Sequence, residues 1–179
     1  MSADWRADVL KFWFSLGYDD WWNGGPDLDH RIRQQFLKLW SAKRELPVES
    51  FLDDPLTALA AVILFDQFPR NMFRGHAEQF ATDQLALGIA KGAVEKGLDH
   101  ELQPKERGFL YMPFQLSEKL ADQDRGLLLF TDLGDPKQLK YAHIHRDLIV
   151  RYGRFPHRNA ILGRASRPDE LASGANKPW

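Results

Sequence analysis

The chain contains no cysteine among its 179 residues. It therefore has no disulfide framework, no thiolate nucleophile and no cysteine-based metal site, which fits a reducing compartment. Long apolar runs are also missing, because no segment reaches the roughly 18 apolar residues of a membrane span. Residues 1–14 carry Asp4, Arg6, Asp8 and Lys11, so they lack the apolar centre of a signal peptide. We therefore expect a cytoplasmic protein without a membrane segment.

Common catalytic signatures are absent as well: there is no G-x-G-x-x-G, P-loop, H-E-x-x-H, G-x-S-x-G or EF-hand loop. No pattern identifies a cofactor. His143 and His145 cannot share a metal on a helix, since residues two apart do not face each other, and no metal site is predicted. These absences remove the enzyme classes that are easiest to recognise and leave other enzymes open.

The chain has little net charge, but its charged residues are unevenly distributed. The net charge of -1 and the pI near 6.6 argue against nucleic-acid binding through phosphate neutralisation. Residues 137–167, however, hold eight Lys or Arg residues and one acid, Asp147. This basic segment either packs on the acidic remainder of the chain or holds an anion.

Helical spacing of apolar residues runs through nearly the whole chain, and no strand-length stretch alternates with period two. The predicted fold class is therefore all-α, with about seven helices in an antiparallel bundle or a short helical solenoid. The length suits a single domain over residues 1–179, with residues 173–179 as a frayed tail.

Local signals predict where the helices begin and end. Asp54-Pro55 starts a helix that is apolar on nearly every side from Leu56 to Phe65, as expected at the centre of a core. Thr82 or Asp83 caps a helix that stops at Gly97, and Gly153 stops another that begins near Pro136. The remaining predicted helices cover 5–14, 28–40, a segment from Pro104 that Pro113 kinks or divides, a segment through Phe130, and a short helix capped by Ser166-Arg167-Pro168-Asp169.

One short sequence motif, called the repeated phrase below, occurs twice: Phe68-Pro69-Arg70-Asn71 and Phe155-Pro156-His157-Arg158-Asn159. In both copies an aromatic residue and a proline end an apolar segment, and a guanidinium and an amide follow. We predict two similar polar turns that form a pocket if they meet. Fork-shaped guanidinium donors and amides suit carboxylates or phosphates, so the predicted anion contacts are Arg70, Arg74, Arg158, Asn71 and Asn159.

Two residues near these turns are candidates for catalysis. Asp66 ends a helix that looks buried, where the helix dipole and burial both oppose a charge, so it needs a partner such as Arg70 or Arg74. A structural ion pair explains it equally well. His157 suits proton transfer, or a single hydrogen bond to a carbonyl.

Two further patterns allow both a structural and a functional interpretation. His145 lies on the apolar stripe of its helix, with Tyr141, Ile144, Leu148, Ile149 and Tyr152, so a core histidine satisfied by one hydrogen bond is one role and a ligand contact the other. A polar stripe is either a solvated face or the wall of a cleft, if its helix survives Pro113; its members are Tyr111, Gln115, Glu118, Asp122 and Arg125.

Several segments together resemble a known family: residues 9–14, 64–75, 80–83, 109–114 with Ser117-Glu118, 145–147 and 153–164. They are similar to the uncharacterised bacterial family known as domain of unknown function 924, over nearly the whole chain. The resemblance implies an all-α, tetratricopeptide-like fold and brings no established reaction. One position departs from the family pattern, since Gln115 stands where the pattern has histidine.

The first hypothesis for function is a pocket for an anionic small molecule, used for binding or for catalysis. Its candidate catalytic residues are Asp66 and His157, and its candidate ligand contacts are Arg70, Asn71, Arg74, Glu118, His145, Arg158 and Asn159. The alternative is a helical-repeat-like module for a protein partner, with Trp21 and Trp22 or the polar stripe as contacts. A third interpretation makes both turns structural, each holding a helix terminus.

Overall fold

The computed structural model describes residues 3–178, so Met1, Ser2 and Trp179, which belong to the predicted domain and tail, lie outside the described residues. Over residues 3–178 the chain is helical and has no strand, which confirms the all-α prediction. It divides into two compact units: unit 1 is Met1–Arg74 with Glu78–Pro113, and unit 2 is Gly75–Ala77 with Phe114–Trp179. The single domain over residues 1–179 stays a prediction.

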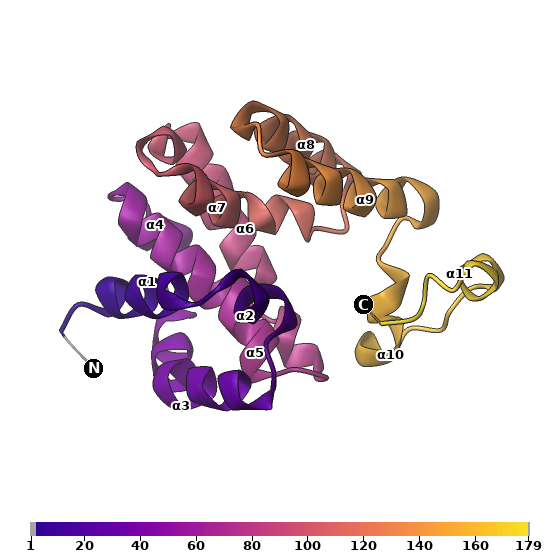
Figure 1. Ribbon diagram of the computed structural model, residues 1–179, viewed down its shortest axis with the longest axis horizontal. Coiled ribbons are helices and arrows are strands. Elements are labelled where there is room, and N and C mark those ends of the chain that lie inside the picture. The colour runs from indigo at the N-terminus through magenta and orange to yellow at the C-terminus, as the bar shows by residue number, and fades with distance from the viewer. Residues whose placement is uncertain (1–2, 179) are drawn as a thin grey trace. The chain divides into compact units, whose positions relative to one another are not determined.

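The helices outnumber the seven predicted, because several connections contain short helices of their own (Figure 1). The aromatic segment around Trp21, for example, is a helix. The α-helices up to residue 115 are α1 (Trp5–Ser15), α2 (Tyr18–Asn23), α3 (Pro26–Lys43), α4 (Pro55–Val62), α5 (Phe68–Met72), α6 (Asp83–Glu95) and α7 (Pro104–Gln115). Short 3₁₀ turns lie at Val48–Phe51, Ala77–Phe80 and Leu98–Glu101, and a π-helical turn lies at Ile63–Gln67. Unit 2 contains α8 (Leu120–Leu133), α9 (Pro136–Tyr152), α10 (Asn159–Leu162) and α11 (Pro168–Ser173), with a 3₁₀ turn at Pro156–Arg158.

Local signals place most helix ends as predicted. Asp54 caps α4 by accepting a hydrogen bond from the Thr57 backbone N–H at 2.9 Å, and Pro55 opens the helix. Gly97 follows α6 and Gly153 follows α9, with φ of 73° and 72°, which is the left-handed conformation that glycine adopts at least cost. The cap of α11 is shifted by one residue: Arg167, not Ser166, is the N-cap, because Glu170 accepts its backbone N–H at 2.8 Å.

The core of unit 1 is built around α4 and its continuation, as predicted. Every residue from Thr57 to Gln67 is buried. Leu56, which was predicted to be buried with the rest of this helix, is 49% exposed. Helix α4 packs against α1 and α6 (Figure 1), and its alanines let these neighbours approach closely.

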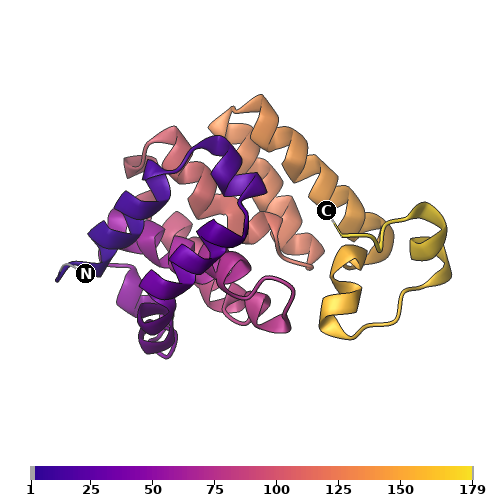
Figure 2. The same ribbon diagram turned by 60° about the horizontal axis from the view of Figure 1, so that its bottom comes forward.

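Unit 2 is built on an antiparallel hairpin of α8 and α9 (Figure 1 and Figure 2). The buried face of α9 is narrower than predicted: His145, Ile149 and Tyr152 are buried, whereas Tyr141 and Ile144 are 43% and 38% exposed. Only the half of the apolar stripe that faces neighbouring elements is covered.

The polar stripe predicted from Tyr111 to Arg125 is not one helix face. Helix α7 ends at Gln115 and α8 begins at Leu120, so the i, i+4 spacing is broken by a loop. Tyr111, Gln115 and Asp122 are buried. The prediction was wrong because Pro113 is followed by a helix end within two residues. No helix among residues 3–178 has the length and apolar character that crossing a membrane requires.

The predicted frayed tail keeps some structure where it is described. The Ser173 hydroxyl lies 2.7 Å from the Tyr152 hydroxyl, and the Ala175 backbone N–H donates to the Glu170 carbonyl at 3.0 Å. The first bond holds the end of α11 on α9, and the second closes the last turn of α11.

Candidate functional site

The first copy of the repeated phrase is not a turn. The π-helical turn at Ile63–Gln67 joins α4 to α5, so Phe68-Pro69-Arg70-Asn71 lies inside a continuous helical segment. The prediction that Pro69 ends the helix was wrong, and the reason is a distant side chain. Pro69 has no N–H to donate to the Phe65 carbonyl, and the Thr82 hydroxyl donates to that carbonyl instead, at 2.7 Å.

Asp66 has the partners that its burial requires. Its side chain is 1% exposed, its Oδ2 accepts from Gln67 Nε2 at 2.5 Å, and its Oδ1 lies 3.8 Å from Arg70 Nη1. Arg70 directs its fork mainly at Asp83, with bonds of 2.8 and 3.0 Å. Burial opposes the charge of Arg70, but Asp83 and Asp66 outweigh it and raise the pKa of the guanidinium.

Asn71 and Arg74 are both bonded to one carboxylate on α3. The Asn71 amide donates to Asp29 Oδ1 at 2.9 Å, and Arg74 donates to both oxygens of Asp29 at 2.6 and 2.9 Å. The hydrogen bond from Arg74 to Asp29 raises the pKa of Arg74. The acids around the first copy therefore match its guanidinium groups, and these bonds fasten α5 to α3 and to the start of α6.

The second copy has a different conformation. Phe155 caps a 3₁₀ turn that Pro156 opens, and Asn159 begins α10. Glu118 holds this turn: its carboxylate accepts the Phe155 backbone N–H at 2.6 Å and both Nη atoms of Arg164 at 3.0 and 3.1 Å. Proline therefore opens a helical segment here, whereas in the first copy it lies within one.

Asn159 belongs to a buried network and not to an open surface. Its amide nitrogen donates to Ser166 Oγ and to Glu170 Oε1, both at 3.2 Å, and its carbonyl oxygen accepts from Arg164 Nε at 3.1 Å. The side chain orients the loop between α10 and α11. A structural role therefore explains these contacts of Asn159.

Three of the candidate residues of unit 2 surround a single phenylalanine ring. The Phe155 ring lies 5.5 Å from the His145 ring, 5.5 Å from the His157 ring and 4.7 Å from the Arg158 guanidinium carbon. We call these four residues the Phe155 cluster. Phe155 itself is 0% exposed and His157 is half-buried, so an apolar anchor holds three nitrogen-bearing side chains in place.

Backbone carbonyls orient two members of the cluster. His145 Nδ1 lies 2.8 Å from the Tyr141 carbonyl oxygen. Gln115, the position that departs from the family pattern, places its amide 3.1 Å from the same nitrogen. Arg158 Nη2 donates to the Leu116 carbonyl at 2.9 Å. The loop that follows α7 therefore lies against the cluster.

The charges near His157 sum to a positive field. Burial, followed by the charges of Arg158, His145 and Arg164, lowers the pKa of His157 to about 4, and Glu118 acts in the opposite direction. Burial by itself would raise the pKa of Glu118, but the hydrogen bonds from Arg164 and the Phe155 N–H bring it below its usual value. At neutral pH His157 is thus uncharged, beside the carboxylate of Glu118 and the guanidinium groups of Arg158 and Arg164.

Acidification is expected to weaken the fold through His157. The pKa of this imidazole is about 4 in the folded protein and about 6.5 in the unfolded chain, so between these values the unfolded chain binds the proton first and stability falls as the pH falls. After discounting for partial exposure, the loss is about 1 to 2 kcal/mol. Urea unfolding of the wild type and of His157→Gln across this range checks it: the stability advantage of the wild type is expected to shrink on acidification. Parallel pH profiles would contradict this.

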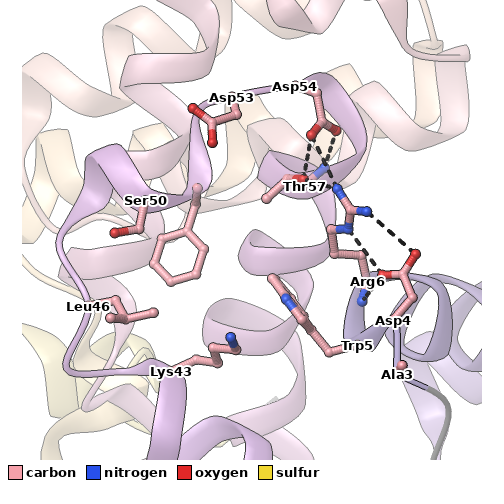
Figure 3. Close-up of a pocket in the computed structure, with 11 residues that line it drawn as sticks. Ala3, Asp4, Trp5, Arg6, Lys43, Leu46, Ser50, Asp53, Asp54 and Thr57 are labelled. Carbon is pink, nitrogen blue, oxygen red and sulfur yellow. Dashed lines mark hydrogen bonds and ion pairs between the residues drawn. The ribbon is translucent and has the colours of Figure 1, made fainter.

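Among residues 3–178 no three His, Asp or Glu side chains gather closely enough to hold a metal ion. The structure does contain an open cavity of about 500 Å³ on the surface of unit 1, which no sequence pattern indicated. Its walls come from Ala3 to Arg6, from the end of α3 and from residues 50–57 (Figure 3). The signal was missed because its polar residues are dispersed and match no motif.

The chain matches a bacterial family of unknown function, DUF924, over residues 9–173. It belongs to this family. A solved structure of a protein of unknown function from Agrobacterium tumefaciens is similar to it, with 38% identity, a TM-score of 0.86, and coverage of 94% of this chain and 95% of the other. No curated protein matches the chain. The predicted resemblance to DUF924 is thus confirmed, and DUF924 membership brings a shared fold without a reaction.

Proposed function

We propose that the protein binds a small anionic molecule at the Phe155 cluster of unit 2. The observation that carries this proposal is the packing of His145, His157 and Arg158 around one buried ring. Guanidinium and imidazole groups are donors that suit a carboxylate or a phosphate. The basic segment of residues 137–167, which either packs on acidic residues or holds an anion, includes His145, His157 and Arg158.

His157 is the group of this site that is suited to proton transfer. Its imidazole is uncharged at neutral pH, because its pKa lies at about 4. An anion beside it would favour the imidazolium and raise that pKa towards neutrality, where a histidine both takes up and releases protons. Binding is the primary proposal, and catalysis by His157 would follow from it.

The proposed anion site does not include the first copy of the repeated phrase. Arg70 and Arg74 are bonded to Asp83 and Asp29, which neutralise them within unit 1. The convergence of Arg70 with Arg158 in one pocket stays a prediction, as does a catalytic role for Asp66. The proposed anion site therefore depends on residues of unit 2 alone.

Loss of anion binding in an Arg158 variant tests the proposal. A ligand at a hundredfold its Kd stabilises the folded protein by about 2.7 kcal/mol, which thermal unfolding detects. Against a panel of sulfate, citrate and phosphate monoesters, we expect at least one to stabilise the wild type, and Arg158→Met to weaken its binding about tenfold or more. The affinity is measured by calorimetry on the folded variant, so that any loss of stability is separated from loss of binding.

Arg146→Met is the matched control, because Arg146 also lies in the basic segment but pairs with Asp124 at 2.6 Å on the surface. It is expected to bind the anion as the wild type does. If Arg146→Met and Arg158→Met weakened anion binding equally, the overall charge of the protein would explain the effect, and no site at Arg158 would be needed. The absence of stabilisation by any member of the panel would contradict the proposal.

A tetratricopeptide-like interaction module is the second proposal, and one observation favours it. Tyr141 and Ile144 lie one turn apart on α9 and remain 43% and 38% exposed, and Leu128 on α8 is 67% exposed. Exposed apolar residues on one hairpin suit a protein partner. Recovery of a stoichiometric partner that is lost on Ile144→Asp and retained on Arg158→Met would favour this function over anion binding.

A further inference from the structure

The cavity of unit 1 is a second candidate binding site, independent of the anion site of unit 2. It measures about 500 Å³, within the range of small-molecule sites in proteins. Trp5 and Phe51 line it and contact each other edge to face, with ring centroids 6.2 Å apart. Phe51 is 1% exposed and Trp5 is half-buried, so the aromatic surface that the cavity offers to a ligand is that of Trp5.

The polar side chains of one wall of the cavity are hydrogen-bonded to one another. Arg6 donates to Asp4 at 3.1 Å, to Asp54 at 3.3 Å and to the Thr57 hydroxyl at 2.9 Å (Figure 3). Asp4 and Asp54 are also the N-caps of α1 and α4. The hydrogen bond from the Thr57 hydroxyl contributes most to lowering the pKa of Asp54. This network is explained by helix capping, so its groups are not the ones that a ligand would use.

Two further charged groups line the cavity. Lys43 extends from the last turn of α3 with its ammonium 5.4 Å from the centre of the Trp5 ring, and Asp53 precedes the cap of α4. Among the residues that the structure describes, neither forms an ion pair. Figure 3 shows Lys43 and Asp53 on opposite sides of the hollow. The cavity thus presents a cation and an anion with aromatic surface beside them.

We propose that this cavity binds a short peptide with free ends. Lys43 would hold the terminal carboxylate, Asp53 the terminal ammonium, and Trp5 would contact an apolar side chain. A single amino acid carries both charges on one carbon, whereas two residues in extended form span up to about 7 Å, which suits groups on opposite sides of a cavity. The opposite signs of Lys43 and Asp53 fix the direction of the peptide.

Calorimetry with the dipeptide leucyl-phenylalanine tests this site, with its N-acetylated and C-amidated forms as matched ligands. We expect millimolar binding of the free dipeptide, as for small ligands in open sites, and binding at least about tenfold weaker for each capped form. Leucine alone is expected to bind as weakly as the capped forms. The indole N–H resonance of Trp5 reports binding at this place and not elsewhere.

The variants separate the two ends of the ligand. Lys43→Met removes the ammonium and keeps an unbranched stem over Trp5, so it should weaken the free dipeptide and the acetylated form while leaving the amidated form unchanged. Asp53→Asn should weaken the free and amidated forms and leave the acetylated form unchanged. Lys38→Met, an exposed lysine of the same helix, is the control and should bind as the wild type does.

Three results would overturn the inference: no binding of leucyl-phenylalanine by the wild type, equal affinity for the free and capped dipeptides, or equal binding by all variants. None of them bears on the anion site, because that site is read from His157 and Arg158 in unit 2. Failure of one proposal therefore leaves the other standing.

Discussion

Replacing Glu170 with alanine is expected to lower the free energy of unfolding by about 3 kcal/mol. The carboxylate is 0% exposed and accepts from Arg154 at 2.9 and 2.7 Å, from the Asn159 amide at 3.2 Å and from the Arg167 backbone N–H at 2.8 Å. Alanine leaves these donors without their acceptor and a guanidinium without its counter-charge. The loop that carries α10 and α11 is expected to loosen first.

Urea unfolding at neutral pH measures this loss, with Asp169→Ala as the control, since Asp169 is the exposed neighbour on the same helix. The pH dependence gives a second check. The bonds from Arg154 lower the pKa of Glu170 to about 2, from about 4.5 in the unfolded chain, so its contribution is complete above the higher value and is lost as the pH falls towards the lower one. If Glu170→Ala lowered the free energy of unfolding by less than about 1 kcal/mol, the network would stabilise the fold less than buried ion pairs usually do.

Replacing Thr82 with valine is expected to cost about 3 kcal/mol, the second of the large effects. The Thr82 hydroxyl donates to the Phe65 carbonyl at 2.7 Å and accepts from Trp40 Nε1 at 3.1 Å, and all three residues are buried. Valine keeps the shape and removes the hydroxyl, so two buried polar groups lose their partner at once. The π-helical turn before Pro69 loses the bond that replaces the missing N–H.

Thr82→Ser distinguishes the hydroxyl from the methyl group. Serine keeps both hydrogen bonds and removes one buried methyl, so its cost is expected to be about 1 kcal/mol. Thermal unfolding of both variants in the same buffer measures the difference. If serine and valine cost the same, the hydroxyl does not support the Phe65 carbonyl as described.

Helix ends that depend on neighbouring residues could be predicted from the sequence. Asp54-Pro55 starts α4, and Gly97 and Gly153 follow α6 and α9, because capping and positive φ are decided within one turn of the chain. The burial of α4 followed from its apolar surface on all sides. For these elements local chemistry and tertiary packing favour the same structure.

The continuation of the helix through Pro69 could not be predicted, because the bond that permits it comes from Thr82, which is distant in sequence. The same holds for the candidate site. Arg70 and Arg74 contact Asp83 and Asp29, partners that no sequence pattern indicated, and their role in holding a ligand stays a prediction. A sequence identifies guanidinium groups that need partners, but the partner is chosen by packing.

The pKa of His157 in the presence of sulfate, followed by NMR through its ring proton, tests the central claim most directly. Sulfate keeps its double charge across the titration, so any change in pKa reports binding near the imidazole and not a change in the anion; His143, exposed on α9, serves as the internal reference. The account predicts a pKa of about 4 without sulfate and an increase of about one unit or more with it. A pKa that stays the same at high sulfate, or that shifts equally for His143, would contradict an anion site at the Phe155 cluster.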